Sequence, residues 1–205
     1  MVTGRTITRS RTGHSWRRVA VMGLVAAWLL VSVPGAIAES GSTPEYAVKA
    51  AFLYNFSKFV DWPAEAFDRT PDRLVVCVLG EDPFGAELDQ TLLGKRVQDK
   101  ELIARRIRQP SEARSCHMVF VGSSDTYALS DVLEALDGAS VLTVAEMPNF
   151  AVRGGMIQLS LDANKVRFTI NLDAARRARL QMSSQLLRLA TQVINGGQEA
   201  PLPSP

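Results

Sequence analysis

Residues 154–194 read GGMIQLSLDANKVRFTINLDAARRARLQMSSQLLRLATQVI, and this stretch decides how the end of the chain folds. Two segments with alternating apolar residues, 156–161 and 165–172, flank the polar turn Asp162-Ala163-Asn164 and predict an antiparallel hairpin. Asp and Asn suit the turn because their side chains bond to nearby backbone and tolerate left-handed conformations. We therefore expect two adjacent antiparallel strands near the end of the domain.

A terminal helix should follow the hairpin. Asp173 is placed to cap a short helical segment, residues 173–178, and residues 180–182 look extended. Ser183 then begins a helix whose apolar positions share one face, namely Leu186, Leu187, Ala190, Val193 and Ile194. A hairpin and an apolar-faced helix close a hydrophobic core, and they indicate no particular chemistry.

A longer helix is predicted at the start of the domain. Thr43 as a cap, Pro44 at the first helical position and Glu45 in the first turn mark its beginning. Pro63 places its end near Trp62, because proline disfavours helix in the preceding residue. The apolar side chains expected to face the core are Ala47, Val48, Ala51, Phe52, Phe56, Phe59 and Val60. No charged partners lie among the aromatic residues of this segment, so we favour core packing over a ligand pocket lined by them.

Strands and helices alternate between these two ends of the domain. Apolar runs predict strands at residues 74–79, 102–107, 117–121 and 140–144, and helices are predicted at 83–93 and 125–136, with a helical turn at 111–114. Such alternation implies a mainly parallel sheet with helices on both faces. We predict an α/β fold, a three-layer α/β/α sandwich whose mainly parallel sheet includes the C-terminal antiparallel hairpin.

The first 38 residues have the three parts of a cleavable secretory signal. Five arginines and no acid precede Glu39, an apolar run of residues 19–33 follows the arginines, and the segment ends in Ala36-Ile37-Ala38. The run is shorter than the roughly twenty residues that a membrane span needs. We expect residues 1–38 to be removed, residues 39–195 to form one periplasmic domain, and residues 196–205 to be a disordered tail.

Removing this segment changes the charge of the chain. The mature part keeps 18 of the 23 basic residues against 21 acidic ones, a formal charge of −3. The basic balance of the precursor therefore belongs to the signal, and nothing in the charge favours nucleic acid as a partner.

Cys77 and Cys116 are the only cysteines. An even pair in an exported protein predicts a disulfide. One cysteine lies in the first predicted strand and the other directly before the third, and these strands can be neighbours in a doubly wound sheet. The 39-position spacing is unlike the CxxC motif of redox enzymes.

Two loops at strand ends are candidates for a ligand site. Residues 80–85, GEDPFG, follow the first strand, but two acids there would repel a phosphate. Residues 122–125, GSSD, follow the third strand and suit an anion better, although we favour simple helix capping by Ser124. The mature chain keeps one histidine, His117, without a base, nucleophile or ligand set around it. We expect no catalytic residues, no metal and no cofactor.

Two features suggest a surface for a protein partner. Residues 147–156 would form an exposed loop that offers Phe150 and Arg153, residue types enriched at interface hot spots. Arg176, Arg177 and Arg179 form a basic cluster that faces either an acidic partner or solvent, and we favour solvent. For the glycines at 154 and 155 we favour a plain structural role, a bend or a close backbone approach.

Several motifs together resemble the YfiR family of small periplasmic proteins. They are YAVKAAFLYNFSKFVDWP at 46–63, VVCVLGEDPFG at 75–85, CHMVFVGSS at 116–124, GGMI-x-L from 154, V-x-F-x-IN from 166 and SS-x-LL-x-LA from 183. The resemblance implies a secreted, non-enzymatic repressor that holds an inner-membrane diguanylate cyclase inactive and so lowers cyclic di-GMP and biofilm. It also implies that an outer-membrane lipoprotein draws the repressor away. A second cysteine pair found in such proteins near the final hairpin is absent here, so a redox switch built on that pair does not transfer.

The sequence thus supports one leading hypothesis and two alternatives. The leading one is a periplasmic regulator that binds the periplasmic domain of a membrane diguanylate cyclase, with a second copy of the chain as a further candidate partner. The first alternative is a small-molecule binding or sensor module with its pocket near Gly80 or Gly122. The second is a secreted enzyme, for which the sequence offers no catalytic constellation.

Overall fold

A mixed nine-stranded sheet forms the middle of the fold in this computed structural model, which describes Met1 and residues 44–124, 126–196 and 198–201. The chain divides into a unit of residues 1–39 and a unit of residues 40–205, and the sheet belongs to the second unit. The strands are β2 (Arg73–Leu79), β3 (Arg96–Val97), β4 (Lys100–Ile107), β5 (Met118–Val121), β6 (Leu142–Ala145), β7 (Ile157–Asp162), β8 (Lys165–Asn171), β10 (Gln192–Asn195) and β11 (Gln198–Pro201).

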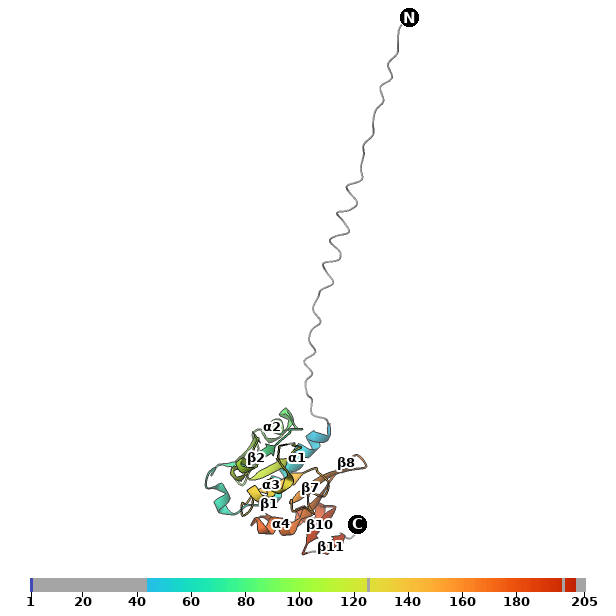
Figure 1. The fold of residues 1–205 in the computed structure, drawn as a ribbon. Coiled ribbons are helices and arrows are strands. Elements are labelled where there is room, and N and C mark those ends of the chain that lie inside the picture. The colour runs from blue at the N-terminus through green and yellow to red at the C-terminus, as the bar shows by residue number, and fades with distance from the viewer. Residues whose placement is uncertain (2–43, 125, 197, 202–205) are drawn as a thin grey trace. The chain divides into compact units, whose positions relative to one another are not determined.

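The strand order is β11-β10-β8-β7-β6-β5-β2-β4-β3. Figure 1 labels β2, β7, β8, β10 and β11 of this sheet. Strands from β4 through β2, β5 and β6 to β7 are parallel, as are β8 and β10. The β7–β8, β3–β4 and β10–β11 pairs are antiparallel. The predicted hairpin is confirmed, with Asp162 opposite Lys165 and with positive φ at Ala163 and Asn164. The sheet is therefore mainly parallel and contains the expected antiparallel hairpin.

Helices cover both faces of the sheet and confirm the three-layer prediction. They are α1 (Pro44–Phe59), α2 (Ala86–Leu92), α3 (Leu129–Ala135), α4 (Leu172–Arg177) and α5 (Ser184–Leu189), with 3-10 turns η1 (Ala64–Phe67) and η2 (Pro110–Ser115). A two-stranded sheet pairs β1 (Val60–Asp61) with β9 (Gln181–Met182). Val76 and Val78 of β2 pack with residues of α1, α2 and α4 on the first face, whereas Cys77 and Leu79 pack with residues of η2 and α3 on the second. Among the described residues, no helix has both the length and the hydropathy to cross a membrane.

The face of α1 that points into the core differs from the predicted one. Its buried residues are Lys49, Ala50, Leu53, Phe56 and Ser57, and the helix ends at Phe59, where β1 begins. Val48 and Ala51 are exposed. The rings of Phe52 and Phe56 do reach Phe168 of β8, at 5.7 and 5.3 Å between centroids. The buried face includes Lys49 and Ser57 because Lys49 is paired with carboxylates and Ser57 donates to the Leu53 carbonyl. The predicted cap, Thr43, lies outside the described residues.

Several predicted element ends also needed correction. Asn171, not Asp173, caps α4, because its Oδ1 accepts from the Ala174 backbone N–H. Ser183 caps α5 as predicted, but α5 ends at Leu189, and Val193 and Ile194 belong to strand β10 beside β8. Within residues 196–205, for which the sequence predicts a disordered tail, residues 198–201 form β11, and residues 197 and 202–205 lie outside the described residues. The predicted helices at 83–93 and 125–136 form only as the shorter α2 and α3.

Candidate functional site

The disulfide joins two neighbouring parallel strands. Cys77 lies in β2 and Cys116 lies two residues before β5, with 6.0 Å between their Cα atoms. The strands pair so that Cys77 lies opposite Val119. The guanidinium of Arg105 approaches Cys116 Sγ at 3.4 Å and also bonds to Ser115. The predicted bridge is thus present, and it fixes the start of β5 against β2 within the second face of the core.

His117 has a structural position. The side chain is buried, its Nδ1 accepts the Val75 backbone N–H at 3.0 Å, and its ring stacks on Phe67 at 4.4 Å. Its backbone carbonyl accepts the Trp62 indole N–H at 2.9 Å. Burial lowers the pKa of His117 to about 4, against the opposing effect of the Ala66 backbone carbonyl. A neutral histidine that accepts a backbone hydrogen bond inside the core has no access to a substrate.

The loop predicted to expose Phe150 in fact buries it. Phe150 is 0% exposed and packs with the second-face core, so it does not belong to an interaction surface. A Cβ atom on Gly155 would lie 2.2 Å from Phe150 Cε1, which shows that the glycine makes room for the ring. Gly154 adopts a φ of +107°, so the favoured structural role of the two glycines is confirmed. Val152 and Arg153 are the exposed residues beside them.

The structure brings this loop next to α4, although the two are far apart in the sequence. Asn171 Nδ2 donates to the Ala151 carbonyl at 2.7 Å while Asn171 Oδ1 caps α4. Gly154 of the loop, Arg177 of α4 and Leu133 of α3 line one groove of about 220 Å³. We call the exposed residues Val152, Arg153 and Arg177 together with this groove the loop–α4 surface.

Arg153, Arg176 and Arg177 differ in their contacts with other residues of the fold. Arg176 donates to Asn195 Oδ1 at 2.8 Å and lies 3.7 Å from Asp173, so it is engaged within the fold. Arg153 and Arg177 are exposed, and neither has an ion-pair partner among the described residues. The loop–α4 surface thus carries two exposed cations, Arg153 and Arg177.

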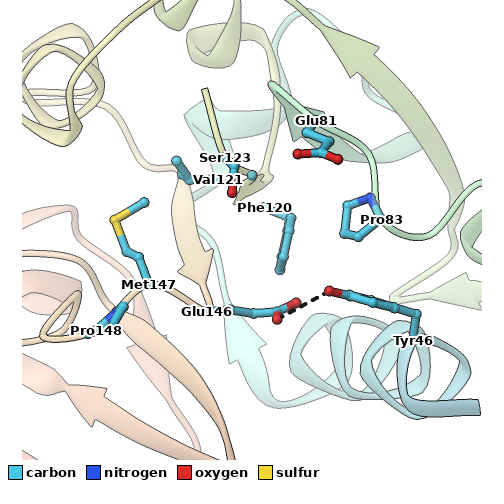
Figure 2. Close-up of a pocket in the computed structure, with 10 residues that line it drawn as sticks. Tyr46, Glu81, Pro83, Phe120, Val121, Ser123, Glu146, Met147 and Pro148 are labelled. Atoms are coloured by element: carbon cyan, nitrogen blue, oxygen red, sulfur yellow. Dashed lines mark hydrogen bonds between the residues drawn. The ribbon is translucent and has the colours of Figure 1, made fainter. Parts of the chain in front are cut away.

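A second hollow, the strand-end cavity, lies where the sequence placed its candidate ligand loops (Figure 2). Glu81 and Pro83 come from the loop after β2, Ser123 from the loop after β5 and Glu146 from the end of β6. Ser124 does not cap α3; its Oγ accepts the Thr126 N–H, and Asp131 accepts the Ala128 N–H at the helix start. Asp125 lies outside the described residues.

Sequence reasoning missed two residues of α1 that contact Glu146, and one of them, Tyr46, lines this cavity. Tyr46 donates to Glu146 Oε2 at 3.5 Å, and Lys49 Nζ lies 2.7 Å from the same oxygen and also pairs with Glu45. Lys49 is almost fully buried, so its ammonium depends on these carboxylates. The signal available in the sequence was Lys49, a lysine among mostly apolar positions of the predicted helix. Within the described part of the chain, no group of three acidic, histidine or cysteine residues is arranged to hold a metal ion.

Comparison with known proteins gives a family and two remote structures. The sequence profile described as YfiR/HmsC-like matches residues 46–191, most of the chain. No curated protein matches significantly. A conserved domain protein from Vibrio cholerae O1 biovar El Tor str. N16961 is similar with 11% identity and a TM-score of 0.49, over 70% of this chain and 59% of its own. The ABC domain in complex with L-Trp from Streptococcus pneumonia has 13% identity and a TM-score of 0.42, over 64% and 59%. The chain thus spans less than two thirds of each structure.

Proposed function

Because the chain belongs to the YfiR/HmsC-like family, we propose that it is a periplasmic repressor that binds an inner-membrane diguanylate cyclase and holds it inactive. Membership supports a regulatory rather than catalytic role in cyclic di-GMP signalling, and it is the observation that carries the proposal. The site is consistent with that role, since His117 is buried in the core and accepts a backbone hydrogen bond there.

The mechanism is a shift between two states of the cyclase. A soluble domain can inactivate a cyclase only by binding its inactive form more tightly than its active form. To shift such an equilibrium almost completely, the repressor must bind the inactive form about 10⁴-fold more tightly than the active form. An outer-membrane lipoprotein that competes for the same repressor would reverse the shift without touching the cyclase.

We assign the loop–α4 surface to the cyclase contact. Arg153 and Arg177 are exposed cations, and Arg176 is held by Asn195. Arg177 and Gly154, the neighbour of Arg153, line the groove, and arginine is enriched at interface hot spots. The partner surface should therefore be acidic.

Deletion of the gene tests the regulatory role. Cyclic di-GMP and biofilm should rise in the deletion strain and fall again when the gene is restored. Unchanged cyclic di-GMP would refute the repressor assignment.

Charge reversal tests the surface. Arg153→Glu and Arg177→Glu should each mimic the deletion in part, because an acidic partner would be repelled, while the melting temperature stays unchanged. Arg108→Glu is the matched control, since Arg108 is exposed and follows β4, several strands away from β7. If deletion raises cyclic di-GMP but neither charge reversal changes it, the repressor assignment is retained and the surface that binds the cyclase lies elsewhere.

Export through a cleaved signal is part of the same proposal. The mature protein should begin at Glu39 and appear in the periplasmic fraction. Intact-mass measurement on that fraction checks both points, and a full-length mass would contradict cleavage.

A further inference from the structure

The loops that follow β2 and β5 leave the sheet in opposite directions. After β2 the chain passes through α2 to β4 on one side, and after β5 it passes through α3 to β6 on the other. α2 packs on the first face and α3 on the second. Open α/β sheets bind ligands in the crevice between two such loops, at the carboxyl ends of the strands. The strand-end cavity lies in that crevice (Figure 2).

Backbone contacts fix the two loops against each other. The Glu81 N–H donates to the Ser123 carbonyl at 3.0 Å, and the Gly122 N–H donates to the Leu79 carbonyl at 2.8 Å. A Cβ atom on Gly122 would lie 2.2 Å from the Glu81 carbonyl oxygen, so only glycine permits this approach. The shape of the cavity is thus set by the fold, which lowers the ordering cost of binding.

The charged residues that line the cavity have one sign. Glu81 and Glu146 line it, and no lysine, arginine or histidine is among its described lining residues. Lys49 reaches Glu146 from α1, but it is shared with Glu45. The three carboxylates and one ammonium give this cluster a formal charge of −2. A recessed site of this charge attracts cations and repels phosphates and carboxylates.

Glu146 keeps one acceptor unused. Its Oε2 accepts from Lys49 and Tyr46, whereas Oε1 is buried and has no hydrogen-bond partner among the described residues. Buried polar atoms normally have a partner, so Glu146 retains unused capacity to accept a hydrogen bond.

Part of the remaining wall is apolar. Figure 2 shows Phe120 between Pro83 on one side and Met147 with Pro148 on the other. The cavity measures about 360 Å³, within the range of small-molecule sites. An apolar body fits between these walls while a charged end reaches the carboxylates.

We propose that the strand-end cavity binds a small organic cation, a primary amine with an apolar body, whose ammonium group pairs with Glu146 and Glu81. This site is separate from the loop–α4 surface and does not depend on the repressor role.

Titration of the purified protein with defined probes tests the inference. The probes are butylamine and 2-phenylethylamine, with the uncharged 2-phenylethanol and the anionic 3-phenylpropionate as matched comparisons. We expect 2-phenylethylamine to bind about tenfold or more tighter than 2-phenylethanol, because the alcohol lacks the charge, and 3-phenylpropionate not to bind. Calorimetry gives the affinities, and backbone amide shifts in nuclear magnetic resonance spectra give the location.

Substitutions distinguish amine binding in the cavity from nonspecific electrostatic attraction to the protein surface. Glu146→Gln and Glu81→Gln should each weaken amine binding about tenfold, and Glu134→Gln, which removes an exposed acid of α3 outside the cavity lining, should leave it unchanged. Because Glu146→Gln also removes a partner of Lys49, the exposed Glu81 provides a variant that leaves that pair intact. Equal binding of amine and alcohol, absence of binding by both amines, or amide shifts away from residues 46, 81 and 123 would overturn the proposal.

Discussion

The side-chain amide of Asn171 donates to the backbone carbonyl of Ala151 at 2.7 Å and thereby ties the loop before β7 to the start of α4. The same side chain caps α4 through its oxygen, so one buried residue orders both parts of the loop–α4 surface. We expect this bridge to help hold Arg153 and Arg177 in their relative positions.

Substitution of Asn171 should separate its two roles. Asn171→Ala loses the cap and leaves the Ala151 carbonyl unpaired, so the free energy of unfolding should fall by about 2–4 kcal/mol. Asn171→Ser keeps a cap oxygen but is too short to reach Ala151, so it should cost only about 1–3 kcal/mol. Urea unfolding of both variants measures the difference. Equal stability of the two would show that the cap contributes nothing.

The burial of His117 predicts a pH-dependent stability. The pKa in the fold, about 4, lies below the unfolded value of 6.5, so the unfolded chain binds the extra proton between these values. Stability from this residue is complete above pH 6.5 and is lost as the pH falls toward 4, a total of about 3 kcal/mol. Urea unfolding between pH 7 and 4 measures how the free energy of unfolding changes with pH.

His117→Asn is the control for this prediction. Its amide oxygen can still accept the Val75 N–H, but it does not titrate. The variant should therefore show a smaller loss of stability between pH 7 and 4. Identical pH profiles for the two proteins would assign the dependence to other groups.

Removal of the disulfide should weaken the fold without changing its topology. Cys77→Ala with Cys116→Ala opens a bridge across 39 positions, and the free energy of unfolding should fall by about 2–4 kcal/mol. Dithiothreitol should cause a similar loss in the unaltered protein and none in the double variant. A loss of the same size in both would mean that the reductant acts elsewhere.

Local patterns predicted the elements that depend on nearby residues. The hairpin of β7 and β8 follows from a period of two around a tight turn, and the start of α5 follows from Ser183. Val193 and Ile194 have helical spacing from Leu186, yet they form a strand. The Thr191 N–H bonds to the Phe168 carbonyl and leads the chain into a parallel pairing with β8 that local spacing does not reveal.

The sites depend on contacts between distant residues, and only some of these contacts could be predicted from the sequence. The loops at Gly80 and Gly122 were predicted because they follow parallel strands. Tyr46 and Glu146 were missed because they meet across 100 positions of sequence. The assignment of Phe150 to the surface failed for the same reason, since its burial depends on packing with α3 and the strands of the second face.

The contact between Phe150 and Gly155 gives the last prediction. Gly155→Ala would place a methyl group against the Phe150 ring, and such overpacking should cost about 1–3 kcal/mol. Phe150→Leu shortens the side chain and should alone cost up to about 1.5 kcal/mol. The double variant should be more stable than the sum of the two losses predicts, because the smaller side chain leaves room for the methyl group. Thermal and urea unfolding of the two single variants and the double variant measure the coupling free energy between positions 150 and 155. Strict additivity would mean that Gly155 is required for its backbone conformation and not for the space it leaves to the ring.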